Sequence, residues 1–325
     1  MNPATLTVPA RLVLVATTAA LVLSGLQAGG AIAANPTTKA KTTTKVKPTA
    51  KARKTPATTK PSLTPSAWKL LAISSRGLTE VSGCAFSRQT SNRVWLHNDA
   101  GDGAVVVPVN VANGRVGQAV TLEGVDVVDP EDIASTTTGD LLLADIGDNA
   151  EVRGAVQLYR FREPTVGATT VVATRLELRY PDAPHNAEAF AVSPDGATGV
   201  IIAKATNGVA AVFRVDLAAT GPQVVSRLGT ITIIGETGYK ANMISAADAI
   251  EGAVLLRTFQ HGYLLNIPVG ATIADAWRSE PRRFAVPQMP QGEALCASPD
   301  GRSLVTASES QGAPSFSLAV GPSPL

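Results

Sequence analysis

The feature that most constrains this chain is a pattern that returns five times along the sequence. Its two clearest copies, EAFAVSPDG at 188–196 and EALCASPDG at 293–301, start with Glu, continue with small and apolar residues and end in Ser-Pro-Asp-Gly. That tetrapeptide favours a tight turn, because Pro restricts φ and Gly accepts positive φ. Weaker copies begin at 82, 131 and 245.

Aligned on their first residues, the copies start at Ser82, Glu131, Glu188, Ser245 and Glu293, which are 49, 57, 57 and 48 residues apart. A second apolar strand follows each copy, and third and fourth strands follow in the first four. Repeats of this length, with about four short strands each, are typical of propeller blades. We therefore expect an all-β fold, a single β-propeller of five four-stranded blades. A β-sandwich would explain the turns but not the long period, and six blades would need a further inner-strand motif.

The two ends of the repeat array predict how the ring closes. The fifth copy runs out of chain before its outermost strand, whereas WKLLAIS at 68–74 is a strand without a blade. We expect this N-terminal strand to complete the last blade, which also removes an open sheet edge. Cys84 and Cys296 follow their strand starts by two and three residues, so they project from opposite blade faces. Because blades one and five are neighbours in a closed ring, these cysteines are predicted to form a disulfide.

The N-terminal region differs in composition from the rest. Residues 1–34 resemble a cleavable signal peptide, with Arg11, an apolar run and Ala31-Ile32-Ala33 as the cleavage motif. Residues 35–67 are rich in Thr, Lys and Pro, contain no Asp or Glu, and are expected to form a disordered linker. The propeller domain is then 68–325, and the mature chain is expected to be secreted or associated with the cell envelope.

The distribution of charge limits the partners. Nine of the 28 basic residues lie in 1–67, which leaves 19 basic against 26 acidic residues in 68–325, a net charge of −7. A folded domain of that charge is a poor nucleic-acid binder. The basic linker is either a plain tether or an arm that contacts the anionic cell envelope. The mature sequence contains no segment that we expect to form a transmembrane helix.

The candidate functional residues gather where inner strands start and second strands end, because both positions meet at one mouth of the propeller channel. The predicted ligand-binding residues are Glu131, Glu188, Glu293, His97, Asn98, Asp99, Asp145, Asp148, Asn149, His185, Lys204, Arg257 and Glu309. The alternative is that the three glutamates form a solvated polar ring with Lys204 and Arg257 that merely lines a wet channel.

Oxygen-rich side chains at the mouth suit a hard cation such as Ca²⁺ or Mg²⁺, so either ion is a possible cofactor. The loops do not fit a twelve-residue calcium loop, and no metal ligand set is assigned. No serine-nucleophile elbow or His-Glu-x-x-His motif occurs in the sequence. No catalytic residue is therefore assigned.

Several motifs resemble those of secreted bacterial propellers of the TolB-like and WD-repeat-like types, in particular actinobacterial ones. These motifs are HNDAGDG, DPEDIA, DIGDN, PHNAEAFAVSPDG and PQGEALCASPDG, and the resemblance covers about 75–310. The chain is also distantly similar to the phytase-like esterase group. The Gly-His and Trp-Asp signature of WD repeats proper is missing.

The function we expect from these observations is that of an exported binding or interaction module, with the polar channel mouth as its site. The alternative, which the distant resemblance implies, is a metal-assisted hydrolase of esters or phosphoesters. A purely structural envelope protein is a third possibility. A small molecule, a polymer and a protein all stay open as the ligand, because the sequence identifies neither the ligand nor the oligomeric state.

Overall fold

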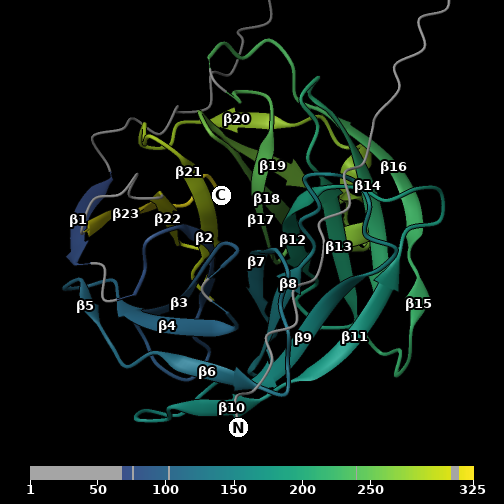
Figure 1. Ribbon diagram of the computed structural model, residues 1–325. Coiled ribbons are helices and arrows are strands. Elements are labelled where there is room, and N and C mark those ends of the chain that lie inside the picture. The colour runs from purple at the N-terminus through teal and green to yellow at the C-terminus, as the bar shows by residue number, and fades with distance from the viewer. Residues whose placement is uncertain (1–67, 75–76, 102, 239, 309–314) are drawn as a thin grey trace, which may run out of the picture. The chain divides into compact units, whose positions relative to one another are not determined.

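Five sheets of mainly antiparallel strands stand around a common axis in the computed structural model (Figure 1). The predicted five-bladed propeller is thereby confirmed. The structure describes residues 68–74, 77–101, 103–238, 240–308 and 315–325. The predicted signal peptide and linker lie outside the described residues. Within the described ranges, no helix combines the length and the apolar character that crossing a bilayer requires.

The blades follow one another along the chain, each starting with its inner strand. Blade 1 contains β2 (Val81–Phe86), β3 (Arg93–Asn98), β4 (Val105–Asn110), β5 (Arg115–Val116) and β6 (Val120–Glu123). Blade 2 contains β7 (Pro130–Ser135), β8 (Asp140–Asp145), β9 (Val156–Arg162) and β11 (Thr174–Arg179). Blade 3 contains β12 (Ala187–Val192), β13 (Thr198–Ala203), β14 (Val209–Asp216) and β16 (Ser226–Thr232).

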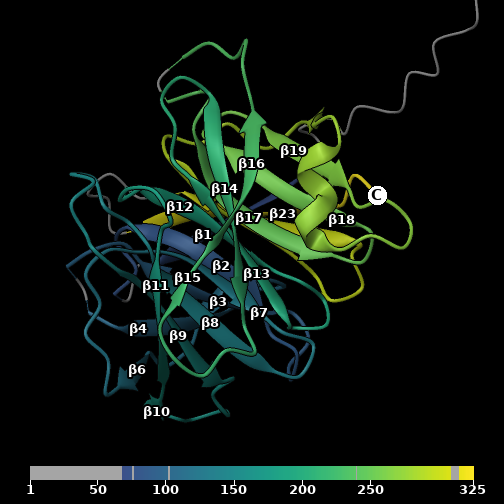
Figure 2. The same ribbon diagram turned by 90° about the vertical axis from the view of Figure 1, so that its right-hand side faces the viewer.

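Blade 4 contains β17 (Ile244–Ile250), β18 (Ala253–Thr258), β19 (Gly262–Asn266) and β20 (Arg282–Phe284). A short 3-10 helix, η2 (Ile273–Arg278), packs against blades 3 and 4, as Figure 2 shows from the side. Blade 5 contains β21 (Gly292–Ala297), β22 (Ser303–Ser308), β23 (Ser315–Pro322) and β1 (Lys69–Ser74).

Two short strands that the sequence did not predict join neighbouring blades. β10 (Thr170–Val172) leaves blade 2 and pairs in parallel with β6 of blade 1. β15 (Gln223–Val224) leaves blade 3 and pairs in parallel with β11 of blade 2. Both cover the outer edge of the preceding blade, where unpaired backbone groups would otherwise face solvent.

The core consists of five apolar layers, one at each junction between neighbouring blades. The inner strands are covered by a blade on each face, so nearly every residue in them is buried. Outer strands such as β6 alternate buried and exposed residues, because only one of their faces is covered. Small and branched apolar residues along the inner strands, mainly Ala, Val, Leu and Ile, allow both faces of these strands to be buried.

The ring closes as predicted. β1 pairs antiparallel with β23, so that the N-terminal strand forms the outer edge of the last blade. Trp68 is buried against Gly321, where a Cβ atom would lie 2.7 Å from Cε2 of the indole. Cys84 and Cys296 form the predicted disulfide across the same junction, with Cα atoms 5.7 Å apart. The closure is therefore held by strand pairing, by aromatic packing and by a covalent bond.

Two carboxylates inside the ring tie further blades together. Asp132 of blade 2 accepts backbone N–H bonds from Phe190 of blade 3 and Ala247 of blade 4. Asp248 of blade 4 accepts the backbone N–H of Ala297 of blade 5. Asp132 thus joins three blades within the ring, and burial raises its pKa well above the ordinary value.

Candidate functional site

The inner strand of every blade carries a β-bulge at the same place, and this bulge builds the channel mouth. The register shifts between residues 81 and 83, 130 and 132, 187 and 189, 244 and 246, and 292 and 294. A bulge leaves one residue outside the ladder and re-aims its side chain. The five residues outside the ladder are Ser82, Glu131, Glu188, Ser245 and Glu293. They are the same five residues on which the sequence repeat aligns.

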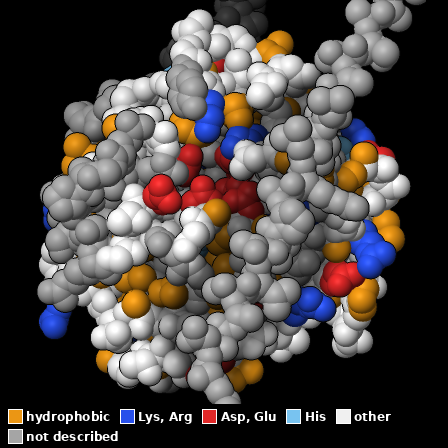
Figure 3. Space-filling view, in the orientation of Figure 1, with side chains coloured by type: hydrophobic (Ala, Val, Ile, Leu, Met, Phe, Trp, Pro, Cys, Tyr) orange, Lys and Arg blue, Asp and Glu red, His pale blue; other side chains and the backbone are white. Residues whose placement is uncertain are grey.

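Three carboxylates come together beside this ring, and we call Asp99, Asp129 and Glu131 the carboxylate cluster. One carboxylate oxygen of each lies within 4.8 Å of the other two. Asp99 follows β3 of blade 1, whereas Asp129 and Glu131 flank Pro130 at the start of β7 in blade 2. Figure 3 shows acidic side chains gathered near the middle of this face, with Lys and Arg side chains beside them.

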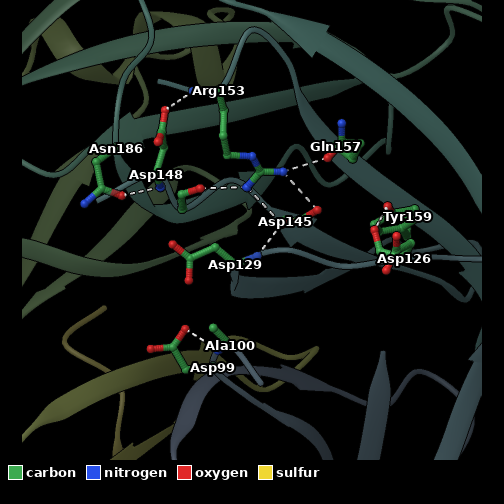
Figure 4. Close-up of polar contacts among 11 residues, drawn as sticks. Asp99, Ala100, Asp126, Asp129, Asp145, Asp148, Arg153, Gln157, Tyr159 and Asn186 are labelled. Atoms are coloured by element: carbon green, nitrogen blue, oxygen red, sulfur yellow. Dashed lines mark hydrogen bonds and ion pairs between the residues drawn. The ribbon is translucent and has the colours of Figure 1, made fainter. Parts of the chain in front are cut away.

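The loop after β8 holds the cluster in place (Figure 4). Asp145 accepts the backbone N–H of Asp129 at 2.8 Å and forms a two-pronged ion pair with Arg153, both at 3.0 Å. Gly147 stands against the cluster, because a Cβ atom there would lie 2.5 Å from Cγ of Asp129 and still closer to one oxygen each of Asp129 and Glu131. The glycine of the DIGDN motif therefore leaves the space that the two carboxylates fill.

The electrostatics of the cluster disfavour three negative charges. Burial raises the pKa of Asp129 to about 6, and the charge of Asp99, together with a hydrogen bond to it, adds to this shift. Burial, followed by the charges of Asp99 and Asp129, raises the pKa of Glu131 well above its ordinary value. Asp129 and Glu131 therefore retain protons at mildly acidic pH unless a further positive charge joins them.

The other two glutamates of the ring lie next to basic side chains. Glu188 forms an ion pair with Lys204, which comes just after β13 of the same blade. Arg257 is fully buried, and its guanidinium packs against Gly292, next to Glu293. Burial lowers the pKa of Arg257 to about 9, and Glu293 partly opposes this shift. All three glutamates are buried, and the predicted alternative of a polar ring that merely lines a wet channel stays a prediction.

His97 and Asn98 lie behind the cluster and not in it. Burial lowers the pKa of His97 to about 4, so the imidazole is neutral at pH 7. Its Nδ1 lies 2.8 Å from the backbone oxygen of Asn98, and its Nε2 is packed at Gly83. Asn98 fastens the segment before β2, because its amide donates to the backbone oxygen of Gly77 and its Oδ1 accepts the N–H of Thr79. Both residues support the mouth.

The remaining predicted residues divide into two groups. Asp148 and Asn149 lie near the mouth, where the backbone N–H of Asp148 donates to Asn186 Oδ1 and Asn186 donates to Asn149. His185 does not join the cluster: its Nε2 lies 2.9 Å from Asp182, and its ring contacts Tyr180 and Phe213. Glu309 lies outside the described residues.

Sequence reasoning missed Asp129, Gly147 and Arg153. Asp129 belongs to the quoted DPEDIA motif. The residues directly before and after Pro130 point to similar sides of an extended chain, so the spacing could have predicted that Asp129 lies beside Glu131. Arg153 lies eight residues beyond its partner Asp145, across a loop whose path no local pattern predicts.

Among the described residues, the carboxylate cluster is the set that could hold a hard cation. Its three carboxylates are oxygen ligands of the kind that Ca²⁺ and Mg²⁺ take, with the other ligand positions left to water or to a bound molecule. The same negative centre would also accept an organic ammonium group.

Comparison with known proteins identifies no family for this chain. No family model matches the chain, and no curated protein sequence matches it. The predicted TolB-like or actinobacterial relationship therefore stays a prediction. Among solved structures, the chain is similar to the hydrazine synthase of Kuenenia stuttgartiensis, with a TM-score of 0.35 and 11% identity over 70% of this chain. The match spans 64% of that protein chain.

Proposed function

We propose that this chain is an exported binding module whose channel mouth holds a cationic group of its ligand. The carboxylate cluster carries this proposal, because three carboxylates from two blades converge within 4.8 Å. The raised pKa values of Asp129 and Glu131 reflect burial and repulsion from neighbouring carboxylates. A bound cation would relieve that repulsion, which favours binding of a positively charged group.

Export is supported by two independent features. The disulfide between Cys84 and Cys296 is typical of proteins that mature in an oxidising compartment. The predicted signal peptide at 1–34 would bring the chain there. N-terminal sequencing of protein recovered from outside the cytoplasmic membrane should find a start near Ala34, and an intact Met1 would contradict export by cleavage.

The binding proposal is tested by calorimetric titration of the protein with two cations, Ca²⁺ and propylammonium. Asp129→Asn should weaken whichever cation binds by at least about tenfold, which corresponds to about 1.4 kcal/mol. Asp126→Asn is the matched control, because Asp126 is exposed and lies apart from the cluster (Figure 4). If neither cation binds, or if both variants behave alike, the proposal is wrong.

The pH dependence provides a second readout. With a pKa of about 6, the charged fraction of Asp129 falls from about nine tenths at pH 7 to about one tenth at pH 5. Cation affinity should therefore rise about tenfold from pH 5 to pH 7, and more if Glu131 also releases a proton. A screen with ester and phosphoester substrates completes the test, since turnover lost in Asp129→Asn would make the site catalytic instead.

A further inference from the structure

A polar pocket of about 630 Å³ shares the loop after β8 with the carboxylate cluster. Its wall includes two lysines, one carboxylate and four neutral polar residues, which are Lys204, Lys240, Glu151, Asn149, Asn186, Thr206 and Asn207. The loop after β8 links the two features, because Gly147 borders the cluster and Asn149, two residues later, lines the pocket. The mouth thus has a carboxylate side on blades 1 and 2 and a lysine-lined side formed by blade 3 and the segment that leads into blade 4.

The two lysines are held at the pocket in different ways. Glu188 fixes the ammonium of Lys204 from the bulge of β12. Lys240 adopts a left-handed backbone with φ of 49°, and its Nζ lies 5.0 Å from the centroid of the Phe259 ring. A residue other than glycine seldom adopts that backbone, and such outliers concentrate at functional sites.

The two positive charges also act on each other. The pKa of Lys204 is lowered first by burial and next by the charge of Lys240. Glu188 pairs with Lys204, so the attraction for an anion comes chiefly from Lys240, and a bound anion would offset the repulsion between the two ammonium groups. The amides of Asn149 and Asn186, positioned by the hydrogen bond between them, add neutral donors of the kind that carboxylate oxygens accept.

A purely anionic ligand would meet opposition at the same mouth. Lys204 lies within the field of Glu131, Glu293 and Asp99, all of which stabilise its charge and would repel an anion. A molecule that carries a positive group beside its negative group satisfies both sides at once. The arrangement of charges therefore selects for a ligand with both signs.

We propose that the pocket takes the carboxylate of a zwitterionic, amino-acid-like group, whose ammonium lies against Asp99, Asp129 and Glu131. This inference rests on the proposed function, because the ammonium is the cationic group that the cluster binds. It adds the chemical class of the ligand and assigns Lys240 a role in recognising it.

The test compares three probes of similar size, which are 4-aminobutyrate, propylammonium and butyrate, by calorimetry on the full chain. The zwitterion should bind at least tenfold more tightly than either singly charged probe. If propylammonium binds and 4-aminobutyrate binds no more tightly, this inference is overturned while the proposed function stands. Butyrate that binds as well as the zwitterion would also overturn it. If no probe and no Ca²⁺ binds, the proposed function itself fails.

Lys240→Asn separates the two sides of the mouth, since Asn tolerates the left-handed backbone at this position. The variant should lower the affinity for 4-aminobutyrate to no more than that for propylammonium. Lys69→Gln is the control, because Lys69 lies on the outer strand of blade 5. Unchanged zwitterion binding in Lys240→Asn would refute the assignment.

Discussion

Replacing Gly147 by Ala tests whether the loop after β8 shapes the carboxylate cluster. The added Cβ would lie 2.5 Å from Cγ of Asp129, whereas ordinary van der Waals contact begins near 3.4 Å. The side chains of Asp129 and Glu131 must therefore withdraw by about 1 Å. Overpacking of this kind typically costs about 1–3 kcal/mol of stability. The φ of Gly147 is not positive, so the change introduces no backbone strain.

Gly154→Ala in the same loop is the matched control, because a Cβ there meets no atom within 4 Å and its φ is not positive either. Urea unfolding should show a lower free energy of unfolding for Gly147→Ala and a change within about 0.5 kcal/mol for Gly154→Ala. Cation titration should show weaker binding in the first variant alone. If Gly147→Ala is as stable as the parent and binds as well, the two carboxylates do not depend on this glycine.

Three other outcomes follow from the structure. The Cys84–Cys296 disulfide spans a sequence separation of 212 residues, and its reduction should lower the free energy of unfolding by up to about 5 kcal/mol. Urea unfolding with and without reductant measures this loss. No change would mean that the closure does not depend on the disulfide. Burial raises the pKa of Asp248 from 3.8 to about 6, so its contribution to stability is present below pH 4 and is lost as the pH rises through 6. In thermal unfolding, Asp248 should make the free energy of unfolding about 1–2 kcal/mol higher at pH 4.5 than at pH 7, a figure kept low because part of the residue's surface meets solvent. Asp248→Asn should shrink this difference. Lys204→Met leaves Glu188 buried without its ion partner and should destabilise the fold by about 3–5 kcal/mol, whereas adding Glu188→Gln should restore much of the loss.

The fold was predictable because the repeat encodes the blade. Alignment on Ser82, Glu131, Glu188, Ser245 and Glu293 located every inner strand, since the need to bury both faces of these strands leaves a visible apolar pattern. The closing strand and the disulfide followed from the geometry of a ring. The short strands β10 and β15 did not follow, because two or three exposed or half-buried residues that pair with another blade carry no apolar period of their own.

The candidate site was predictable in its location but not in its membership. Strand starts and strand ends indicated the mouth, and they included Asp99 and Glu131 of the cluster. The sequence could not show that a bulge moves each aligned residue out of the ladder, because a bulge is a relation between two strands. It also could not separate His185, which turns toward Tyr180 and Phe213, from its neighbours at the mouth.

The pairing of β1 with β23 sets an order of events for the growing chain. The strand that ends at Ser74 is synthesised first, yet its partner begins at Ser315. At about 5–20 residues per second, the 240 intervening residues, 75–314, take on the order of tens of seconds to appear. During that time Trp68 has no Gly321 to cover, and Cys84 has no Cys296 to meet. A chain that stops short of its last strand is therefore left with an open edge and a free thiol at once, two marks by which an incomplete molecule differs from a finished one.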